Sequence, residues 1–164
     1  DIADAQIEKC ESIKTKYNID FNESGDFPIE KKYELVVACD VIEHVLDCDD
    51  FLEKINRIQP PNGYLIISTP NLGSLARRIM LMLGINPFIE VSKFIGVNGS
   101  GLVPVGHIKY FVEGSVDRLL ENSGYSIIEK FNTGINLPGG YNSKVLGRIF
   151  PSMRWHLLYT CVKR

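Results

Sequence analysis

Residues 33–71 read YELVVACDVIEHVLDCDDFLEKINRIQPPNGYLIISTPN, and this stretch decides the fold. The apolar run at 33–39 has the length and β-branched content of a strand that is buried on both faces of a parallel sheet. Apolar residues recur every three or four positions from 47 to 58, which predicts an amphipathic helix. The sequence PPNG at 60–63 ends that helix, and 64–68 is a second buried strand. A strand, a helix and a second strand in this order predict a parallel βαβ unit.

The rest of the chain repeats the alternation of helices and strands. Helical spacing is present at 2–16, 72–83, 113–123 and 143–150, while 18–21, 125–131 and 155–162 read as strands. Residues 132–141 read as a glycine-rich loop, and 85–106 as a long irregular segment. The whole pattern predicts one α/β domain, 1–164, with a doubly wound, mostly parallel sheet covered by helices on both faces.

Composition excludes several classes of protein. The chain has 164 residues, a formal net charge of -2 and 45% hydrophobic residues, as one globular domain does. No apolar run approaches the roughly 18 residues of a membrane span, and no secretory signal opens the chain, so we expect a cytoplasmic protein. The mild acidity argues against nucleic acid as a partner. Four cysteines without a C-x-x-C pair indicate neither a zinc site nor a disulfide framework.

Residues 33–71 resemble the middle of a class I S-adenosylmethionine-dependent methyltransferase, and in particular the quinone-biosynthesis O-methyltransferases. The motifs DVIEHV, PNG and STPN come in that family's order, and GHIKYF at 106–111 continues the resemblance. It implies a Rossmann-like sheet. Because that family opens with a strand and a glycine-rich turn, and Asp1 matches the acid that ends its second strand, we expect the chain to be missing its first strands.

The resemblance also implies which residues bind S-adenosylmethionine. Asp1 would accept hydrogen bonds from the ribose hydroxyls, and Ile2 would pack on the adenine. The alternative for Asp1 is a helix cap. The residue that matches Cys39 lines the cofactor, and Asp40 follows it at the carboxyl end of a strand, where α/β sheets bind ligands.

Asp40, Glu43 and His44 have the spacing i, i+3 and i+4, so they would share one face if a helical turn follows the strand. In the quinone-biosynthesis enzymes, the matching acid, Glu and His are associated with a divalent metal. A cation such as magnesium would acidify a phenolic hydroxyl. The alternative is an acidic first helical turn in which His44 is only packed.

Two histidines are candidates for a catalytic base, because an imidazole titrates near neutral pH. His44 is one, and His107, at the exit of the irregular segment, is the other; a structural role is the alternative for each. We interpret His156, beside Trp155, as structural.

The resemblance implies methyl transfer from S-adenosylmethionine to a small-molecule acceptor, with oxygen as the expected acceptor atom. The acceptor itself stays open among quinone precursors, sugars, lipids and cell-wall intermediates. A non-catalytic methyltransferase-like binding subunit and a nicotinamide-dependent Rossmann oxidoreductase are the alternatives, although no Tyr-x-x-x-Lys constellation supports the second. Residues 85–106 are expected to form a lid over the acceptor, with an ordinary insertion as the alternative.

Overall fold

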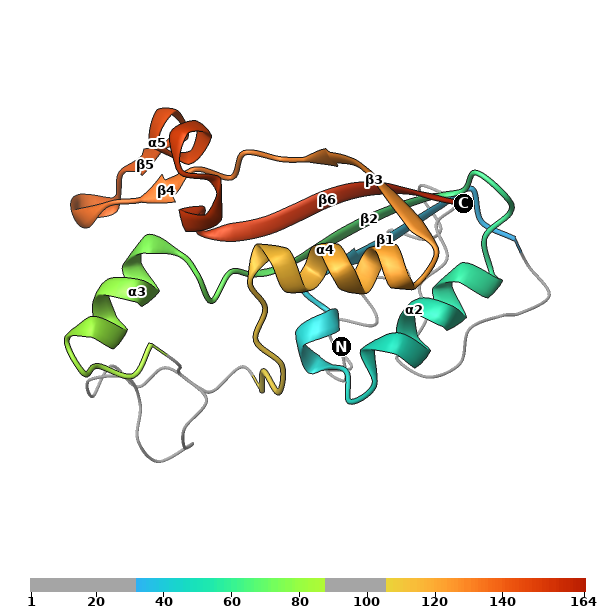
Figure 1. Ribbon diagram of the computed structural model, residues 1–164, viewed down its shortest axis with the longest axis horizontal. Coiled ribbons are helices and arrows are strands. Elements are labelled where there is room, and N and C mark those ends of the chain that lie inside the picture. Colours follow the sequence, from blue (N-terminus) through green and yellow to red (C-terminus); the bar gives the residue numbers. More distant parts are fainter. Residues whose placement is uncertain (1–31, 88–105) are drawn as a thin grey trace, which may run out of the picture. The chain divides into compact units, whose positions relative to one another are not determined.

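The computed structural model describes residues 32–87 and 106–164, which belong to one compact unit, Lys32–Arg164 (Figure 1). A four-stranded sheet has the order β1-β2-β6-β3. Strand β1 pairs parallel with β2, whereas β6 runs antiparallel to both β2 and β3, so β1, β2 and β3 share one direction. The strands are β1 (Leu35–Cys39), β2 (Tyr64–Pro70), β3 (Tyr125–Lys130) and β6 (His156–Lys163). This arrangement confirms the predicted α/β class with its mostly parallel sheet.

Four α-helices and three short 3₁₀ helices accompany this sheet in the described part of the chain. The α-helices are α2 (Cys48–Arg57), α3 (Leu75–Met82), α4 (Glu113–Asn122) and α5 (Lys144–Ile149). The 3₁₀ helices are η1 (Ile42–His44), η4 (Pro138–Gly140) and η5 (Pro151–Met153). Helices α2 and α4 lie on the same side of the sheet in Figure 1. None of these described helices is long and apolar enough to cross a membrane.

Residues at both ends of helix α2 explain why it begins and ends where it does. The side chain of Asp47 caps the helix by accepting a hydrogen bond from the backbone N–H of Asp50 at 3.0 Å. Acidic residues occupy the first turn and basic residues the last, which suits the helix dipole. Leu52 and Ile55 are buried on one stripe. The predicted helix at 47–58 is therefore confirmed to within one residue at each end.

The prediction that both sheet strands of the 33–71 stretch are buried on both faces is wrong for β1. Leu35 and Val37 are 51% and 59% exposed, and Ala38 is the buried residue of this strand. The exposed side chains alternate along β1 with the more buried ones, so only one of its two faces is covered. Strand β2 lies inside the sheet, and its Leu65 and Ile67 are buried as predicted.

The sequence predicted a loop over the whole glycine-rich stretch at 132–141, but part of this stretch is a strand in the structure. It contains β4 (Ile135–Asn136), which pairs antiparallel with β5 (Asn142–Ser143). Gly134 permits this hairpin, because its φ of +82° lies in the left-handed region and a Cβ there would lie 2.0 Å from the side-chain oxygen of Asn142. Local composition indicated the turn, but the pairing depends on contacts across it.

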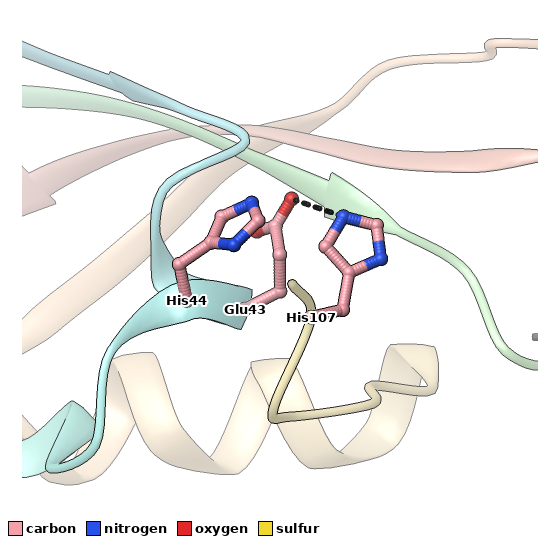
Figure 2. A group of neighbouring side chains, drawn as sticks. All are labelled: Glu43, His44 and His107. Carbon is pink, nitrogen blue, oxygen red and sulfur yellow. Dashed lines mark ion pairs between the residues drawn. The ribbon is translucent and has the colours of Figure 1, made fainter. Parts of the chain in front are cut away.

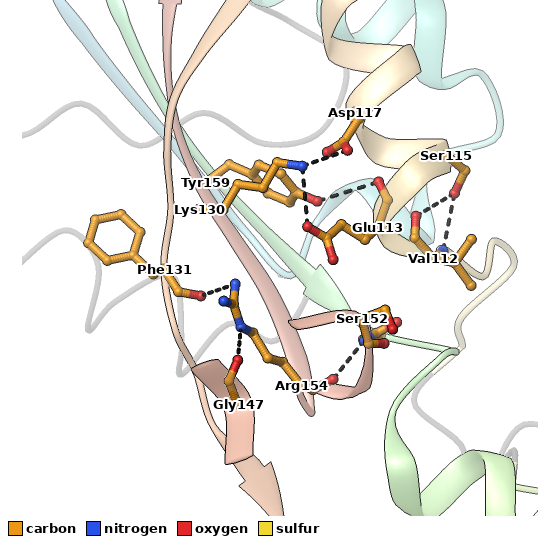
Figure 3. Close-up of polar contacts among 11 residues, drawn as sticks. Val112, Glu113, Ser115, Asp117, Lys130, Phe131, Gly147, Ser152, Arg154 and Tyr159 are labelled. Carbon is orange, nitrogen blue, oxygen red and sulfur yellow. Dashed lines mark hydrogen bonds and ion pairs between the residues drawn. The ribbon is translucent and has the colours of Figure 1, made fainter. Parts of the chain in front are cut away.

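Polar contacts fix α4 and the β4–α5 region to the large sheet (Figure 3). Lys130 of β3 pairs with Asp117 at 2.6 Å and with Glu113 at 3.2 Å on α4. Partial burial disfavours the ammonium charge, yet the two carboxylates outweigh this effect and raise the pKa of Lys130. Arg154 donates to the carbonyl oxygens of Gly147, at 2.8 Å, and Phe131, at 3.4 Å. The Arg154 contacts thereby join the segment before β6 to α5 and to the residue that follows β3.

Candidate functional site

The candidate site lies where the parallel strands end. The carboxyl ends of β1 and β2 lie at the same sheet edge, because Cys39 pairs with Ser68. The first residue of β6, His156, lies at this edge as well, because it pairs antiparallel with Pro70. Open α/β sheets bind their ligands at the carboxyl ends of the strands.

Asp40 connects three strands at this edge. Its φ of +55° is left-handed, so the chain turns sharply after β1. Its Oδ1 accepts a hydrogen bond from Ser68 Oγ at 2.9 Å and lies 2.6 Å from His156 Nε2. Asp40 therefore ties the end of β1 to the end of β2 and the start of β6.

Glu43 places a carboxylate in the interior beside this edge. The residue belongs to η1, and only 1% of its surface is exposed. Its Oε2 accepts a hydrogen bond from Thr69 Oγ1 at 3.1 Å, whereas Oε1 has no hydrogen-bond partner. Oε1 lies 3.8 Å from His107 Nε2 (Figure 2). A buried carboxylate with an unsatisfied oxygen is costly, so its position favours a functional role.

Two imidazoles face this carboxylate. Figure 2 shows the Glu43 carboxylate between the rings of His44 and His107, whose centroids are 4.8 Å apart. Nδ1 of His44 lies 3.2 Å from the carbonyl oxygen of Gly106. The backbone N–H groups of Ile108 and Lys109 donate to the Glu43 carbonyl oxygen at 2.9 and 3.0 Å. These backbone bonds hold residues 106–109 against η1 and thereby bring His107 to Glu43.

The structure corrects the predicted metal-binding set. Asp40 does not join Glu43 and His44, because the chain is left-handed at Asp40 and the helical turn begins only at Ile42. Among residues 32–87 and 106–164, the ligand atoms of Glu43, His44 and His107 lie within 4.8 Å of one another. Two imidazoles and one carboxylate suit a transition metal, whereas magnesium prefers oxygen ligands. The magnesium set inferred from the resemblance is therefore not assembled.

Asn71, at the end of the STPN motif, organises the chain after β2. It is fully buried, and its Nδ2 donates to the carbonyl oxygens of Ser152, at 3.1 Å, and Arg154, at 2.7 Å. Its Oδ1 accepts from the Gly73 N–H at 2.8 Å, and its carbonyl accepts from Arg77 Nη1 at 2.8 Å. The amide thus fixes the approach to α3.

The remaining predicted residues have different outcomes. Asp1 and Ile2 lie outside the described residues, as does most of the segment 85–106 that we expect to form a lid. Cys39 is exposed at the end of β1, next to Asp40. His156, which we interpreted as structural, reaches the site edge through Asp40. The position of His156 in the chain could have indicated this location, because His156 lies at the start of the last strand. A last strand that runs antiparallel begins at the sheet edge where the parallel strands end.

Several solved structures share the fold of this chain. An S-adenosylmethionine-dependent methyltransferase from Mesorhizobium loti has a TM-score of 0.61 at 12% identity, over 99% of this chain and 78% of that one. One from Clostridium acetobutylicum has a TM-score of 0.59 at 13% identity, over 99% and 73%. Magnesium protoporphyrin IX methyltransferase from Synechocystis, solved with bound S-adenosylhomocysteine, has a TM-score of 0.56 at 14% identity, over 100% and 62%. The fold is that of S-adenosylmethionine-dependent methyltransferases.

The sequence comparison extends this from fold to family. A family described as "Methyltransferase domain" matches residues 1–130, most of the chain. No curated protein matches the sequence. The chain belongs to this methyltransferase domain family, and it spans 66%, 70% and 73% of three of the solved structures it resembles.

Proposed function

We propose that this domain transfers the methyl group of S-adenosylmethionine to a hydroxyl oxygen of a small-molecule acceptor, with His107 as the general base. The observation that carries the proposal is the buried carboxylate of Glu43, whose Oε1 faces His107 Nε2 at 3.8 Å. A carboxylate in this position orients an imidazole and stabilises its protonated form. Membership of the methyltransferase family supports S-adenosylmethionine as the cofactor. The Glu43–His107 pair supports removal of a proton from an acceptor hydroxyl.

The proposed reaction needs one proton transfer. S-adenosylmethionine supplies a reactive sulfonium methyl group, and its carbon–sulfur bond breaks as the carbon–oxygen bond to the acceptor forms. The acceptor hydroxyl loses its proton to His107, which becomes an imidazolium beside Glu43. Thr69, which donates to Oε2 of Glu43, keeps the carboxylate in its rotamer. Most of the remaining rate comes from alignment of the acceptor and exclusion of water.

His107→Gln in the full protein tests the proposal. We expect turnover, measured as S-adenosylhomocysteine formed, to fall by roughly 10²- to 10⁴-fold, with cofactor affinity by calorimetry unchanged. His44→Gln compares the two candidate bases, because it removes the neighbouring imidazole and keeps both Glu43 and His107. If both variants retain full turnover across neutral pH, histidine is not the base.

A metal ion is the second candidate role for this site. The three donors of Glu43, His44 and His107 within 4.8 Å of one another favour it. A bound divalent cation would acidify the acceptor hydroxyl as a Lewis acid. Loss of activity on chelation, and its recovery with zinc or manganese, would make His107 a ligand in place of a base.

Cytoplasmic location and the binding of S-adenosylmethionine through Asp1, Ile2, Cys39 and Asp40 remain part of this proposal. The alternative is a methyltransferase-like subunit that binds the cofactor without turnover. One solved relative, from Haloferax volcanii, is a methyltransferase in complex with an activator protein. Cofactor binding without S-adenosylhomocysteine formation, with or without an added partner, would favour that alternative.

A further inference from the structure

Helix α5 presents a face of mixed apolar and basic character to the solvent. Val145 and Ile149 are 71% and 60% exposed, and Phe150, directly after the helix, is exposed as well. Lys144 and Arg148, both exposed, have the same i, i+4 spacing one position earlier. Residues with this spacing are neighbours on a helix surface, so a basic stripe lies beside an apolar stripe. We call these five residues the α5 face.

The opposite side of α5 is fixed to the rest of the domain. Gly147 is buried, and a Cβ there would lie 2.4 Å from the side-chain oxygen of Asn132 and 2.8 Å from the Cα of Gly134. The backbone carbonyl of Lys144 accepts a hydrogen bond from Asn132 Nδ2 at 2.7 Å. The carbonyl of Gly147 accepts one from Arg154 Nε at 2.8 Å (Figure 3). Because these contacts fix the rotation of the helix about its axis, the α5 face points to solvent.

The region around the α5 face is basic. No acidic side chain follows Glu129 in the sequence, and this part of the chain includes β4, β5, α5 and η5. Residues 72–87, which contain α3, have no acidic side chain either. Figure 1 shows α3, β4 and α5 at the end of the unit opposite to α2. Within the described residues of this region, no carboxylate offsets the charges of Lys144 and Arg148.

An anionic lipid surface fits this face better than other partners do. Bases and large apolar side chains together are typical of helices that lie on membranes, where the apolar residues enter the bilayer interface and the bases meet lipid phosphates. Tyr141, exposed directly before β5, belongs to a residue type that is enriched at that interface. A second copy of the chain across a two-fold axis would bring two basic stripes together. Nucleic acid would leave the apolar stripe uncovered, since its binding depends on bases and stacking aromatic groups.

We propose that the α5 face docks this domain on an anionic lipid bilayer surface. The apolar stripe and Phe150 enter the boundary between headgroups and acyl chains, while the basic stripe meets the lipid phosphates. The contact is weak and reversible, because so few apolar and basic side chains make a small anchor. It is independent of the proposed function, since none of these residues belongs to the candidate site.

Vesicle sedimentation with the full protein tests the proposal. One set of vesicles contains equal parts of phosphatidylglycerol and phosphatidylcholine, and the other contains phosphatidylcholine alone. We expect the bound fraction to rise with lipid concentration for the anionic vesicles and to be much smaller for the neutral vesicles. Added salt should lower the bound fraction, because salt screens the charges of exposed bases.

Two double variants separate the basic stripe from the apolar stripe. Lys144→Gln with Arg148→Gln should weaken binding to the anionic vesicles by roughly 10- to 30-fold, since each base near such a surface contributes about fivefold. Val145→Gln with Ile149→Gln should weaken it by roughly tenfold or more, because two apolar side chains no longer enter the interface. Glutamine is a good helix former, so both variants should unfold in urea as the parent does.

Matched controls come from exposed positions outside the α5 face. Arg118→Gln removes a base from α4. Leu46→Gln removes an apolar side chain that is 83% exposed between η1 and α2. Both variants should bind the anionic vesicles as the parent does.

Three results of the vesicle assay would overturn the proposal: no binding to the anionic vesicles, equal binding to the neutral vesicles, or parent-like binding by both double variants. Two further results would also overturn it, because they would assign the face to another partner. One is a dimer in sedimentation velocity that Val145→Gln with Ile149→Gln dissociates. The other is a nucleic acid that binds the parent and does not bind the Lys144→Gln, Arg148→Gln variant.

Discussion

The Glu43→Gln variant tests whether the carboxylate of Glu43 has a catalytic or a structural role. The substitution keeps the size of the side chain and removes its charge. Because the amide oxygen can still accept from Thr69 Oγ1, the hydrogen bond at Oε2 need not be lost. Oε1 has no hydrogen-bond partner, so the folded protein loses no bond there. We therefore expect the free energy of unfolding to change by less than about 1 kcal/mol, or to rise.

The effect on turnover follows from the distance between Glu43 and His107. A full charge on each group at 3.8 Å interacts by about 4 kcal/mol at an effective dielectric constant of about 20. That energy is available only once His107 has taken a proton. Its loss corresponds to a fall in turnover of roughly 10³-fold, since about 1.4 kcal/mol is tenfold in rate.

The assay measures S-adenosylhomocysteine release and urea unfolding on the same preparations. Glu121→Gln is the control, because Glu121 is an exposed glutamate of α4, and it should match the parent in both measurements. Full turnover in Glu43→Gln would refute the reasoning. So would a loss of stability above about 2 kcal/mol, since the carboxylate would then be a structural group.

Two further predictions concern the core and pH. Tyr125→Phe should lower the free energy of unfolding by about 1–3 kcal/mol, measured by urea unfolding, because Tyr125 donates to the buried Gln59 Oε1 at 2.7 Å and the variant leaves that oxygen unsatisfied. The free energy of unfolding should also fall as the pH rises above about 9. Burial raises the pKa of the Cys161 thiol from 9.0 to about 12, and it also raises the pKa values of the Tyr125 and Tyr159 hydroxyls. The unfolded chain releases these protons first, so alkali favours unfolding, while below the ordinary thiol pKa this stability is fully present. Urea unfolding at neutral pH and at about pH 10 measures the loss, and Cys161→Ala should reduce it; an unchanged dependence in that variant would assign the loss to the tyrosines alone.

Much of the fold could be predicted because its signals are local. The helix at 47–58 was predicted from apolar spacing, and the structure places α2 within one residue of it at each end. Strand β2 was predicted from an apolar run and a Pro-Asn-Gly turn. These features depend on contacts between residues a few positions apart, so a window of sequence contains them.

The candidate site could be predicted only in part. Glu43, His44 and His107 were each identified from the sequence, but the spacing of the first two grouped them with Asp40. A left-handed residue at position 40 breaks the helical periodicity on which that grouping relied. The pairing of Asp40 with His156, 116 positions away, has no local signal.

The sequence by itself determined the strands of the large sheet, the alternation of strands and helices that makes an α/β fold, and the family to which the chain belongs. Only the tertiary structure decided that β6 inserts between β2 and β3 and that Glu43 faces two imidazoles. The physical reason is the range of the interactions. Helices and turns arise from neighbours in the chain, whereas a buried carboxylate, an ion pair or a cavity arises where distant segments pack, and no periodicity encodes which segments meet.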